Sequence, residues 1–320
     1  MLAHLPRVAA ALACAAASLL VTRGRGPRAA SSPPSYAGVL TFSTSGAGDV
    51  FHPNMVQDLD LSTNALAVRF TGLDATRARS GETAYLQRLG AGLYADHGVV
   101  VADAQGVPGA PLFVCKQYQW SLNRICSSPK VTPDGRRVAF VSIGSGGSVC
   151  KNGYDMFWAG FVIVTDRRGA PIARFEGYYD PEWLPDGRLL MMGSACRGAG
   201  IWIADPALRQ LSRVDGGRVA TPASAPAINP DGRRLAFVWN SQVWALTLGA
   251  RPEGAGLTQL TALAKPVTAA AWSPDGASVA ALMFDVSMPV RAVALFRPGE
   301  QRSMEFRQLP LYPYGPLSWR

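Results

Sequence analysis

One nine-residue phrase recurs along this chain and constrains its fold more than any other feature. The copies are "TPDGRRVAF" (residues 132–140), "LPDGRLLMM" (184–192), "NPDGRRLAF" (229–237) and "SPDGASVAA" (273–281). Proline presets the first central position of a tight turn, aspartate bonds back to the backbone, and glycine supplies a positive φ. Apolar residues flank each turn on both sides. Each phrase therefore predicts two strands joined by a tight turn, which is a β-hairpin.

The spacing of the phrase indicates a repeat. Its prolines lie at intervals of 52, 45 and 44 residues: Pro133, Pro185, Pro230 and Pro274. A further strand follows the hairpin in each unit, such as "FVIVTD" ending at Asp166 and "IWIAD" ending at Asp205. A repeat of roughly 40–50 residues with several strands per unit is typical of propeller blades. The apolar positions are consecutive in the second strand, which predicts burial on both faces.

The repeated "SPDG…(I/V)AF" followed by "IWVAD"-like strands resembles the TolB-type, WD-like β-propeller repeat. The four phrases cover residues from about 126 to 300. Two further blades can be drawn upstream, one through "AGVLTFST", "NMVQDLDLST" and "NALAVRFTG", the other from Thr83 to Lys116. The resemblance implies an all-β fold, a six-bladed β-propeller over residues 36–320. TolB carries an extra α/β domain for which we expect no room here, so the resemblance implies the fold and not TolB's role.

The first blade lacks an innermost strand in this scheme. The last residues, "GPLSWR", match the stretch before a PDG turn, with Trp319 where Trp183 and Trp272 fall. We therefore expect the C-terminal strand to complete blade 1 and close the ring. Closure removes the exposed sheet edges that an open array would leave.

The N-terminal segment predicts export. Residues 1–30 are expected to be a signal peptide or an N-terminal anchor, and residues 31–35 a linker. Arg7 precedes an apolar run from Val8 to Val21, which suits a signal-peptide core and is short for a membrane span. Three arginines after the run leave an uncleaved anchor open, and Cys14 leaves a lipoprotein open. The predicted location is periplasmic or secreted, with membrane anchoring as the alternative; any membrane contact is through this segment only.

The cysteine count agrees with export. Apart from Cys14 there are Cys115, Cys126, Cys150 and Cys196, which allow three connectivities. In the blade layout that the resemblance implies, all four lie on the rim opposite the PDG turns. Cys150 and Cys196 hold the same loop position in adjacent blades, while Cys115 ends one blade and Cys126 begins the next. We predict disulfides Cys115–Cys126 and Cys150–Cys196; four free thiols in a reducing compartment are the alternative.

The search for catalytic chemistry yields no motif. The region after the N-terminal segment holds two histidines, His52 and His97, and no Gly-x-Ser-x-Gly elbow, phosphate-binding loop or His-Glu-x-x-His motif. Both histidines share a rim with Asp49 and Asp96, which leaves a metal site open beside their interpretation as polar turn residues. We predict no catalytic residue, cofactor or metal, and a structural role for the aspartates of the PDG turns.

The net charge is +9 and several arginines fall in the PDG turns. They predict either a solvated rim or a surface that attracts an anionic partner. No reader motif for nucleic acid occurs, so we expect no nucleic-acid partner.

The opposite rim is expected to carry the binding residues. Tyrosine, tryptophan and arginine, the side chains that binding hot spots use, gather in its long loops. The candidates are Tyr118, Trp120, Arg124, Tyr154, Asp155, Tyr178 and Tyr179. The alternative is that these aromatics pack the loops onto the rim.

We predict a monomeric, non-catalytic binding or scaffold protein that mediates protein–protein or ligand interaction in the cell envelope. Its partner is an envelope protein or ligand that the sequence does not name. The alternative is a propeller hydrolase or lyase with a site in the central channel. Ionisable residues converging on the channel would favour the enzyme, and an apolar channel with an open aromatic rim would favour the binding protein.

Overall fold

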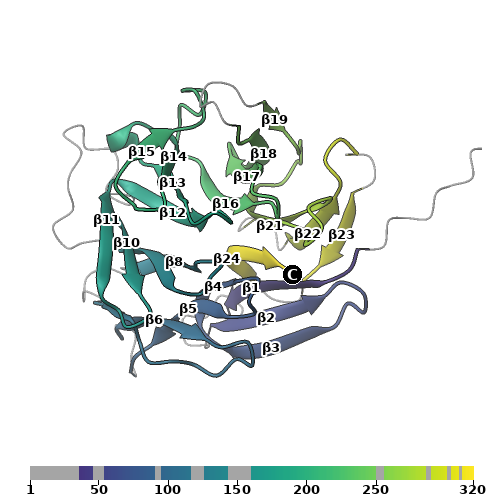
Figure 1. Ribbon diagram of the computed structural model, residues 1–320. Coiled ribbons are helices and arrows are strands. Elements are labelled where there is room, and N and C mark those ends of the chain that lie inside the picture. Colours follow the sequence, from purple (N-terminus) through teal and green to yellow (C-terminus); the bar gives the residue numbers. More distant parts are fainter. Residues whose placement is uncertain are drawn as a thin grey trace, which may run out of the picture. The chain divides into compact units, whose positions relative to one another are not determined.

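The fold is a six-bladed β-propeller. The computed structural model describes residues 36–45, 54–90, 95–116, 126–142, 160–249, 256–285, 290–300, 304–309 and 312–320. Within the compact unit Ser35–Arg320, six four-stranded antiparallel sheets are arranged as blades around a common centre (Figure 1). This confirms the predicted fold class.

Each blade runs from a strand beside the channel to a strand at the circumference. Blade 1 contains β24 (Tyr312–Trp319), β1 (Val39–Ser45), β2 (Met55–Asp60) and β3 (Leu66–Thr71). Blade 2 contains β4 (Leu73–Arg77), β5 (Thr83–Arg88), β6 (His97–Ala102) and β7 (Phe113–Cys115). Blade 3 contains β8 (Cys126–Val131), β9 (Arg137–Ser142), β10 (Phe161–Asp166) and β11 (Pro171–Glu176).

The remaining blades follow the same order. Blade 4 contains β12 (Tyr178–Trp183), β13 (Leu189–Gly193), β14 (Gly200–Ala204) and β15 (Leu211–Arg213), with the short 3-10 helix η1 (Ala195–Arg197) after β13. Blade 5 contains β16 (Ser224–Ile228), β17 (Arg234–Trp239), β18 (Gln242–Thr247) and β19 (Leu257–Gln259). Blade 6 contains β20 (Val267–Trp272), β21 (Val279–Asp285), β22 (Val290–Phe296) and β23 (Glu305–Gln308).

The C-terminal strand closes the ring, as the sequence predicts. Strand β24 pairs antiparallel with β1, and Leu40 lies opposite Trp319. The Val39 N–H donates to the Arg320 carbonyl at 2.8 Å, and the Arg320 N–H donates back to Val39 at 3.1 Å. The first blade is therefore built from both ends of the propeller segment.

Blade 2 begins earlier than the sequence predicts. Its innermost strand is β4, which starts at Leu73 rather than Thr83. The segment "LDATR" was missed because it is half polar and lacks the PDG phrase. The following turn nevertheless resembles a PDG turn: the Gly81 N–H donates to Ala78 at 3.0 Å, and the Ala78 N–H donates to Glu82 at 2.8 Å.

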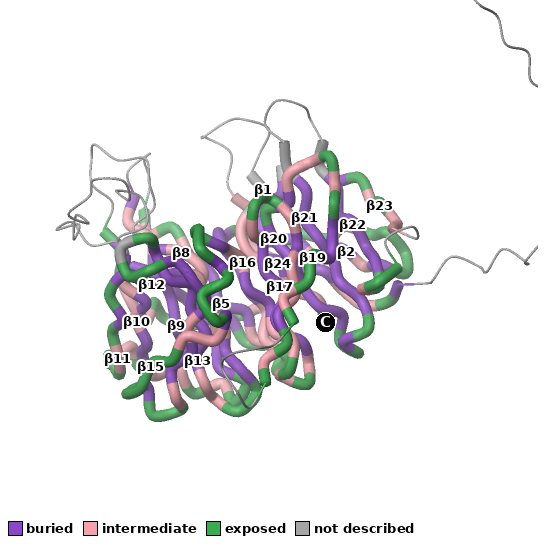
Figure 2. The backbone as a smooth tube through the Cα atoms, turned by 90° about the horizontal axis from the view of Figure 1, so that it is seen from above, coloured by how far each residue is buried: buried purple, intermediate pink, exposed green. Residues whose placement is uncertain are grey.

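The core lies between the blades, where their sheets stack face to face (Figure 2). All five residues of β13 are buried, and in β9 every residue except the first is buried. The consecutive apolar positions after the PDG turns thus fill two interfaces at once, one on each side of the blade. This confirms the burial on both faces that the sequence predicts.

The PDG turns are held by their own side chains. In each turn the aspartate accepts a hydrogen bond from the N–H two residues later, at 3.0 Å for Asp134, 3.1 Å for Asp186, 2.7 Å for Asp231 and 2.9 Å for Asp275. The turn glycines take φ values between 69° and 83°, which other residues adopt at a cost. The structural role predicted for these aspartates is confirmed.

Two arginines of the PDG turns fasten one blade to the next. The Arg137 guanidinium of blade 3 lies 4.9 Å from the centre of the Trp183 ring in blade 4. It also donates to the carbonyls of Gly187 at 3.4 Å and Pro206 at 3.0 Å. Stacking over the indole face and two bonds to carbonyls make this side chain a staple between blades 3 and 4.

The same staple joins blades 5 and 6 and is missing between blades 4 and 5. The Arg234 guanidinium lies 4.5 Å from the Trp272 ring and donates to Gly276 at 2.6 Å. At the corresponding position blade 4 has Leu189, and blade 5 then has Ile228 where the others have tryptophan. At these three interfaces arginine and tryptophan are therefore present or absent together.

Candidate functional site

The innermost strands of all six blades enclose a cavity of about 370 Å³ at the PDG end of the channel. We call this cavity the PDG mouth. Three tryptophans, Trp183, Trp272 and Trp319, line it together with the four prolines of the PDG turns. Its charged lining residues are Arg77, Arg79, Lys130, Glu182 and Arg320. A cavity of this size, with apolar walls and a few charged groups, has the properties of a ligand site.

A second cavity of about 270 Å³ lies further along the same strands. We call it the inner cavity; it is lined by Asp74, Ser128, Asp180 and other residues near the start of the innermost strands. Lys130 and Leu317 line both cavities. These two residues therefore lie where the cavities meet.

A ring of left-handed residues surrounds the inner cavity. Asp74, Ser128, Asp180, Ala225 and Gly315 have φ values of 49°, 51°, 43°, 51° and 75°. Each belongs to the innermost strand of a different blade, and each lies at a break in the pairing register of that strand. A β-bulge re-aims a side chain, so the repeated bulge places these residues around the channel.

Asp180 joins three blades. Its two carboxylate oxygens accept hydrogen bonds from the Ser128 hydroxyl of blade 3 at 2.9 Å and from the Ala225 N–H of blade 5 at 3.0 Å. Burial raises the pKa of Asp180, and the bonds from Ala225 and Ser128 oppose that rise only in part. The Asp180 carboxyl group therefore takes up a proton more readily than an exposed aspartate does.

An ion pair joins the innermost strands of two neighbouring blades at the PDG mouth. The Lys130 ammonium of blade 3 lies 2.6 Å from the Glu182 carboxylate of blade 4, and both side chains are largely buried. Ionisable residues thus converge on the channel, and Lys130, Glu182 and Asp180 are bonded to a neighbouring blade. An alignment of the repeats would have paired Lys130 with Glu182, because each lies three residues before the proline of its blade's PDG turn.

The predicted binding residues divide into two groups. Tyr118, Trp120, Arg124, Tyr154 and Asp155 lie outside the described residues. Tyr178 and Tyr179 begin β12, and their exposed fractions are only 7% and 3%.

Both tyrosines pack within the propeller. The Tyr179 hydroxyl donates to the Ala223 carbonyl at 2.7 Å, and the Tyr178 ring meets the Trp202 ring edge-on at 5.9 Å. Neither side chain is an open contact surface in this structure, in agreement with the packing alternative. The binding role of the seven residues stays a prediction.

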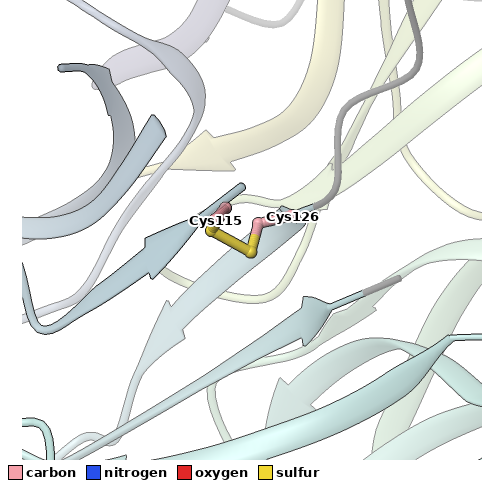
Figure 3. Close-up of a disulfide and its surroundings, with 2 residues drawn as sticks. All are labelled: Cys115 and Cys126. Carbon is pink, nitrogen blue, oxygen red and sulfur yellow. A yellow bond between two sulfur atoms is a disulfide. The ribbon is translucent and has the colours of Figure 1, made fainter. Parts of the chain in front are cut away.

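One predicted disulfide is present (Figure 3). Cys115 and Cys126 are bonded, with 5.8 Å between their Cα atoms. The bond ties β7 of blade 2 to β8 of blade 3, and both cysteines are buried. Cys150 and the Cys196 side chain lie outside what the structure describes, so their pairing stays a prediction.

No group of three or more histidine, cysteine, aspartate or glutamate side chains suited to a metal occurs among the described residues. His52 and Asp49 lie outside them, so the metal alternative at that rim is untested. In the described part of the chain, no helix is both long and apolar enough to cross a membrane.

Comparison with known proteins identifies the fold and no closer relationship. No family model and no curated protein matches the chain. Among solved structures, TolB from Acinetobacter baumannii matches with 13% identity and a TM-score of 0.64, over 90% of this chain and 67% of that one. A chain of the nidogen/laminin complex matches with 12% identity and a TM-score of 0.57, over 88% and 98%.

An oligogalacturonate lyase in complex with manganese matches with 14% identity and a TM-score of 0.50, over 86% of this chain and 74% of that one. At such identities the likeness shows the fold alone, a β-propeller like that of TolB, in agreement with the resemblance of the repeats. The similar structures include both a protein complex and an enzyme, so the fold does not choose between these functions.

Proposed function

We propose that this protein is an exported, non-catalytic binding or scaffold protein of the cell envelope, and that its protein or ligand partner engages the PDG mouth. The observation that carries the proposal is the construction of that mouth. Its lining comes from all six blades, and those blades are fastened to one another by closure, by the arginine–tryptophan staples and by the Lys130–Glu182 pair. A site fixed in advance loses less entropy when a partner binds.

Ionisable residues converge on the channel, which by itself favours the enzyme alternative, but the way these groups are bonded supports a binding function. Lys130, Glu182 and Asp180 each bridge two or more blades. Such groups shape and stiffen the walls of the site. The likeness to a propeller solved within the nidogen/laminin complex is compatible with a binding role.

Export is part of the same proposal. Disulfides persist in oxidising compartments such as the periplasm, and Cys115 is bonded to Cys126. The N-terminal segment has the apolar run of a signal peptide. These two features support a periplasmic or secreted location, with membrane anchoring through that segment as the alternative.

The alternative function, a hydrolase or lyase of the channel, is favoured by the ionisable residues that converge on the channel, and most directly by Asp180. Asp180 is a buried carboxyl group with a raised pKa at the inner cavity, and strongly perturbed carboxyl groups in cavities include general acids. Asp74 and Lys130 line the same cavity. If this function holds, Asp180→Asn abolishes turnover of a ligand that the variant still binds.

The experiment is a pull-down from envelope extract with the exported protein, two charge-reversal variants and Trp120→Ala. Arg79 is exposed and lines the PDG mouth, whereas Arg136 is exposed on the same rim and is not part of the lining. We expect the partner to be captured by the parent and by Arg136→Glu, and to be lost from Arg79→Glu. Retention by Arg79→Glu together with loss from Trp120→Ala would move the partner to the rim opposite the PDG turns, which we call the disulfide rim.

A further inference from the structure

One carboxylate in blade 1 is shared by three arginines. The Asp58 Oδ2 atom lies 3.1 Å from Arg69 Nη1, 3.1 Å from Arg77 Nη1 and 3.5 Å from Arg320 Nη2. Its other oxygen accepts a hydrogen bond from the Thr41 hydroxyl at 2.5 Å. The residues come from β1, β2, β3, β4 and the end of β24, which lie side by side where the ring closes (Figure 1). We call these three arginines and Asp58 the seam cluster.

The seam cluster has positive charge in excess, and part of it is buried. The side chains of Arg77, Arg69 and Asp58 are 5%, 13% and 14% exposed. The Arg69 Nε atom is buried and has no hydrogen-bond partner among the described residues. A guanidinium cannot relieve the excess by losing its proton, since it stays charged at any physiological pH. Burying cations without matching anions is costly.

Part of this excess positive charge lies in the lining of the PDG mouth. Arg77 and Arg320 of the seam cluster line that cavity, and the exposed Arg79 lines it beside them. Among the described residues that line the cavity, Glu182 supplies the one side-chain carboxylate, and it is bonded to Lys130. Within the described lining, therefore, no side-chain anion is left to balance Arg79 and the seam cluster.

We infer that the seam cluster and Arg79 form a binding site for an oxyanion, a carboxylate or a phosphate group, presented by the ligand of the PDG mouth. Guanidinium forks match the oxygens of both groups with paired hydrogen bonds. The cavity of about 370 Å³ is larger than an inorganic ion needs, so the group is carried by a larger ligand. This inference rests on the proposed function for the location of the ligand, and it adds the ligand's chemistry.

A purely structural role for the cluster makes a different prediction. Arg77 also makes other hydrogen bonds near the seam. Its backbone N–H donates to the Ser318 hydroxyl at 3.0 Å, and its side-chain Nε donates to the Gly81 carbonyl at 3.1 Å. A structural cluster would lose stability on mutation without gaining affinity for any anion. Anion affinity is therefore the quantity to measure, and Arg79 is the residue to change first.

The test uses the full chain and two probes, inorganic phosphate and citrate, each compared with chloride at equal ionic strength. Isothermal titration and thermal unfolding are followed together. We expect one or both probes to bind saturably and to raise Tm on the order of 3 °C at ten times Kd. Phosphate binding alone assigns a phosphate group to the ligand, and citrate binding alone assigns a carboxylate.

The variants separate a site from general charge attraction. We expect Arg79→Gln to weaken probe binding about five- to tenfold with Tm in chloride unchanged, and Arg136→Gln to leave both unchanged. Asp58→Asn removes the competing carboxylate, so it should bind the probe more tightly; where that variant has a lower Tm in chloride, the probe should restore it.

The inference is overturned if neither probe acts beyond chloride, or if Arg79→Gln and Arg136→Gln weaken binding equally. Loss of the partner from Arg79→Glu with no probe binding would leave the proposed function standing and refute the anion site. Probe binding with the partner retained by Arg79→Glu would support the anion site and move the partner elsewhere.

Discussion

The adjacent arginines of one PDG turn should differ sharply in their contribution to stability. Arg137 stacks on Trp183 at 4.9 Å and donates to two carbonyls of blade 4. Its neighbour Arg136 is 84% exposed, and its contact with Asp134 is a loose 3.9 Å. We therefore expect Arg137→Ala to destabilise the propeller and Arg136→Ala to leave its stability nearly unchanged.

The magnitude follows from the contacts that are lost. A cation–π contact at a partly exposed site contributes about 0.5–2 kcal/mol. A hydrogen bond from a charged group contributes about 1.5–3 kcal/mol, and solvent screening of a partly exposed guanidinium reduces this. A net loss of about 2 kcal/mol is expected for Arg137→Ala, which lowers Tm by roughly 4 °C in a domain of this size.

The assay is thermal unfolding followed by circular dichroism, with calorimetry to test reversibility. Arg234→Ala, which removes the second staple onto Trp272, should behave like Arg137→Ala. The double variant Arg137→Leu with Trp183→Ile copies the pair found between blades 4 and 5, so its cost should be less than the sum of the single changes. Equal melting of Arg136→Ala and Arg137→Ala would refute the staple.

Four further outcomes are expected. Deleting residues 316–320 should open the ring and lower Tm sharply, and a truncated protein that melts like the parent would disprove closure. Cys115→Ser should cost about 3 kcal/mol, less any strain, by the chain-entropy relation, measured by urea unfolding. Burial acts to raise the pKa of Asp215, but bonds from Arg213 and from the Val219 N–H outweigh it and the pKa is lowered. The Asp215 carboxylate should therefore stabilise the fold above pH 3.8, and this stabilisation should be lost as pH falls through its lowered pKa. Asp215→Asn should flatten the dependence of stability on pH below about pH 4. If the disulfide rim contacts a partner, Trp120→Ala should weaken its binding by roughly 2 kcal/mol or more in a titration, and unchanged affinity would remove Trp120 from the contact.

The sequence predicted the blades that carry the PDG phrase, because the turn chemistry and the apolar strand lie within a few residues of each other. It also predicted closure, since Trp319 repeats a position held by Trp183 and Trp272. It missed β4, because "LDATR" follows neither an alternating nor a consecutive apolar pattern. Local patterns recover strands that their own residues define, and they fail where tertiary pairing defines the strand.

The candidate site was less predictable for the same reason. Lys130 and Glu182 occupy one repeat position in adjacent blades, so comparing the repeats would have paired them. The seam cluster offers no such signal: Asp58 and Arg320 are far apart in the sequence and meet only because β24 closes the ring. The aromatic residues of the loops led to the prediction of a binding surface on the disulfide rim. The buried Tyr178 shows that an aromatic residue there can serve packing instead.

Because β24 closes the ring, the propeller does not require its chain ends to lie in blade 1. The backbone atoms of Val39 and Arg320 are within hydrogen-bonding distance, so a short peptide can join them without disturbing the pairing. A circular permutant opened at the exposed turn after β10 and joined across this gap should fold into the same ring. In the natural order blade 1 is completed only when β24 has been synthesised, whereas in such a permutant the seam would form earlier and a different blade would be completed last.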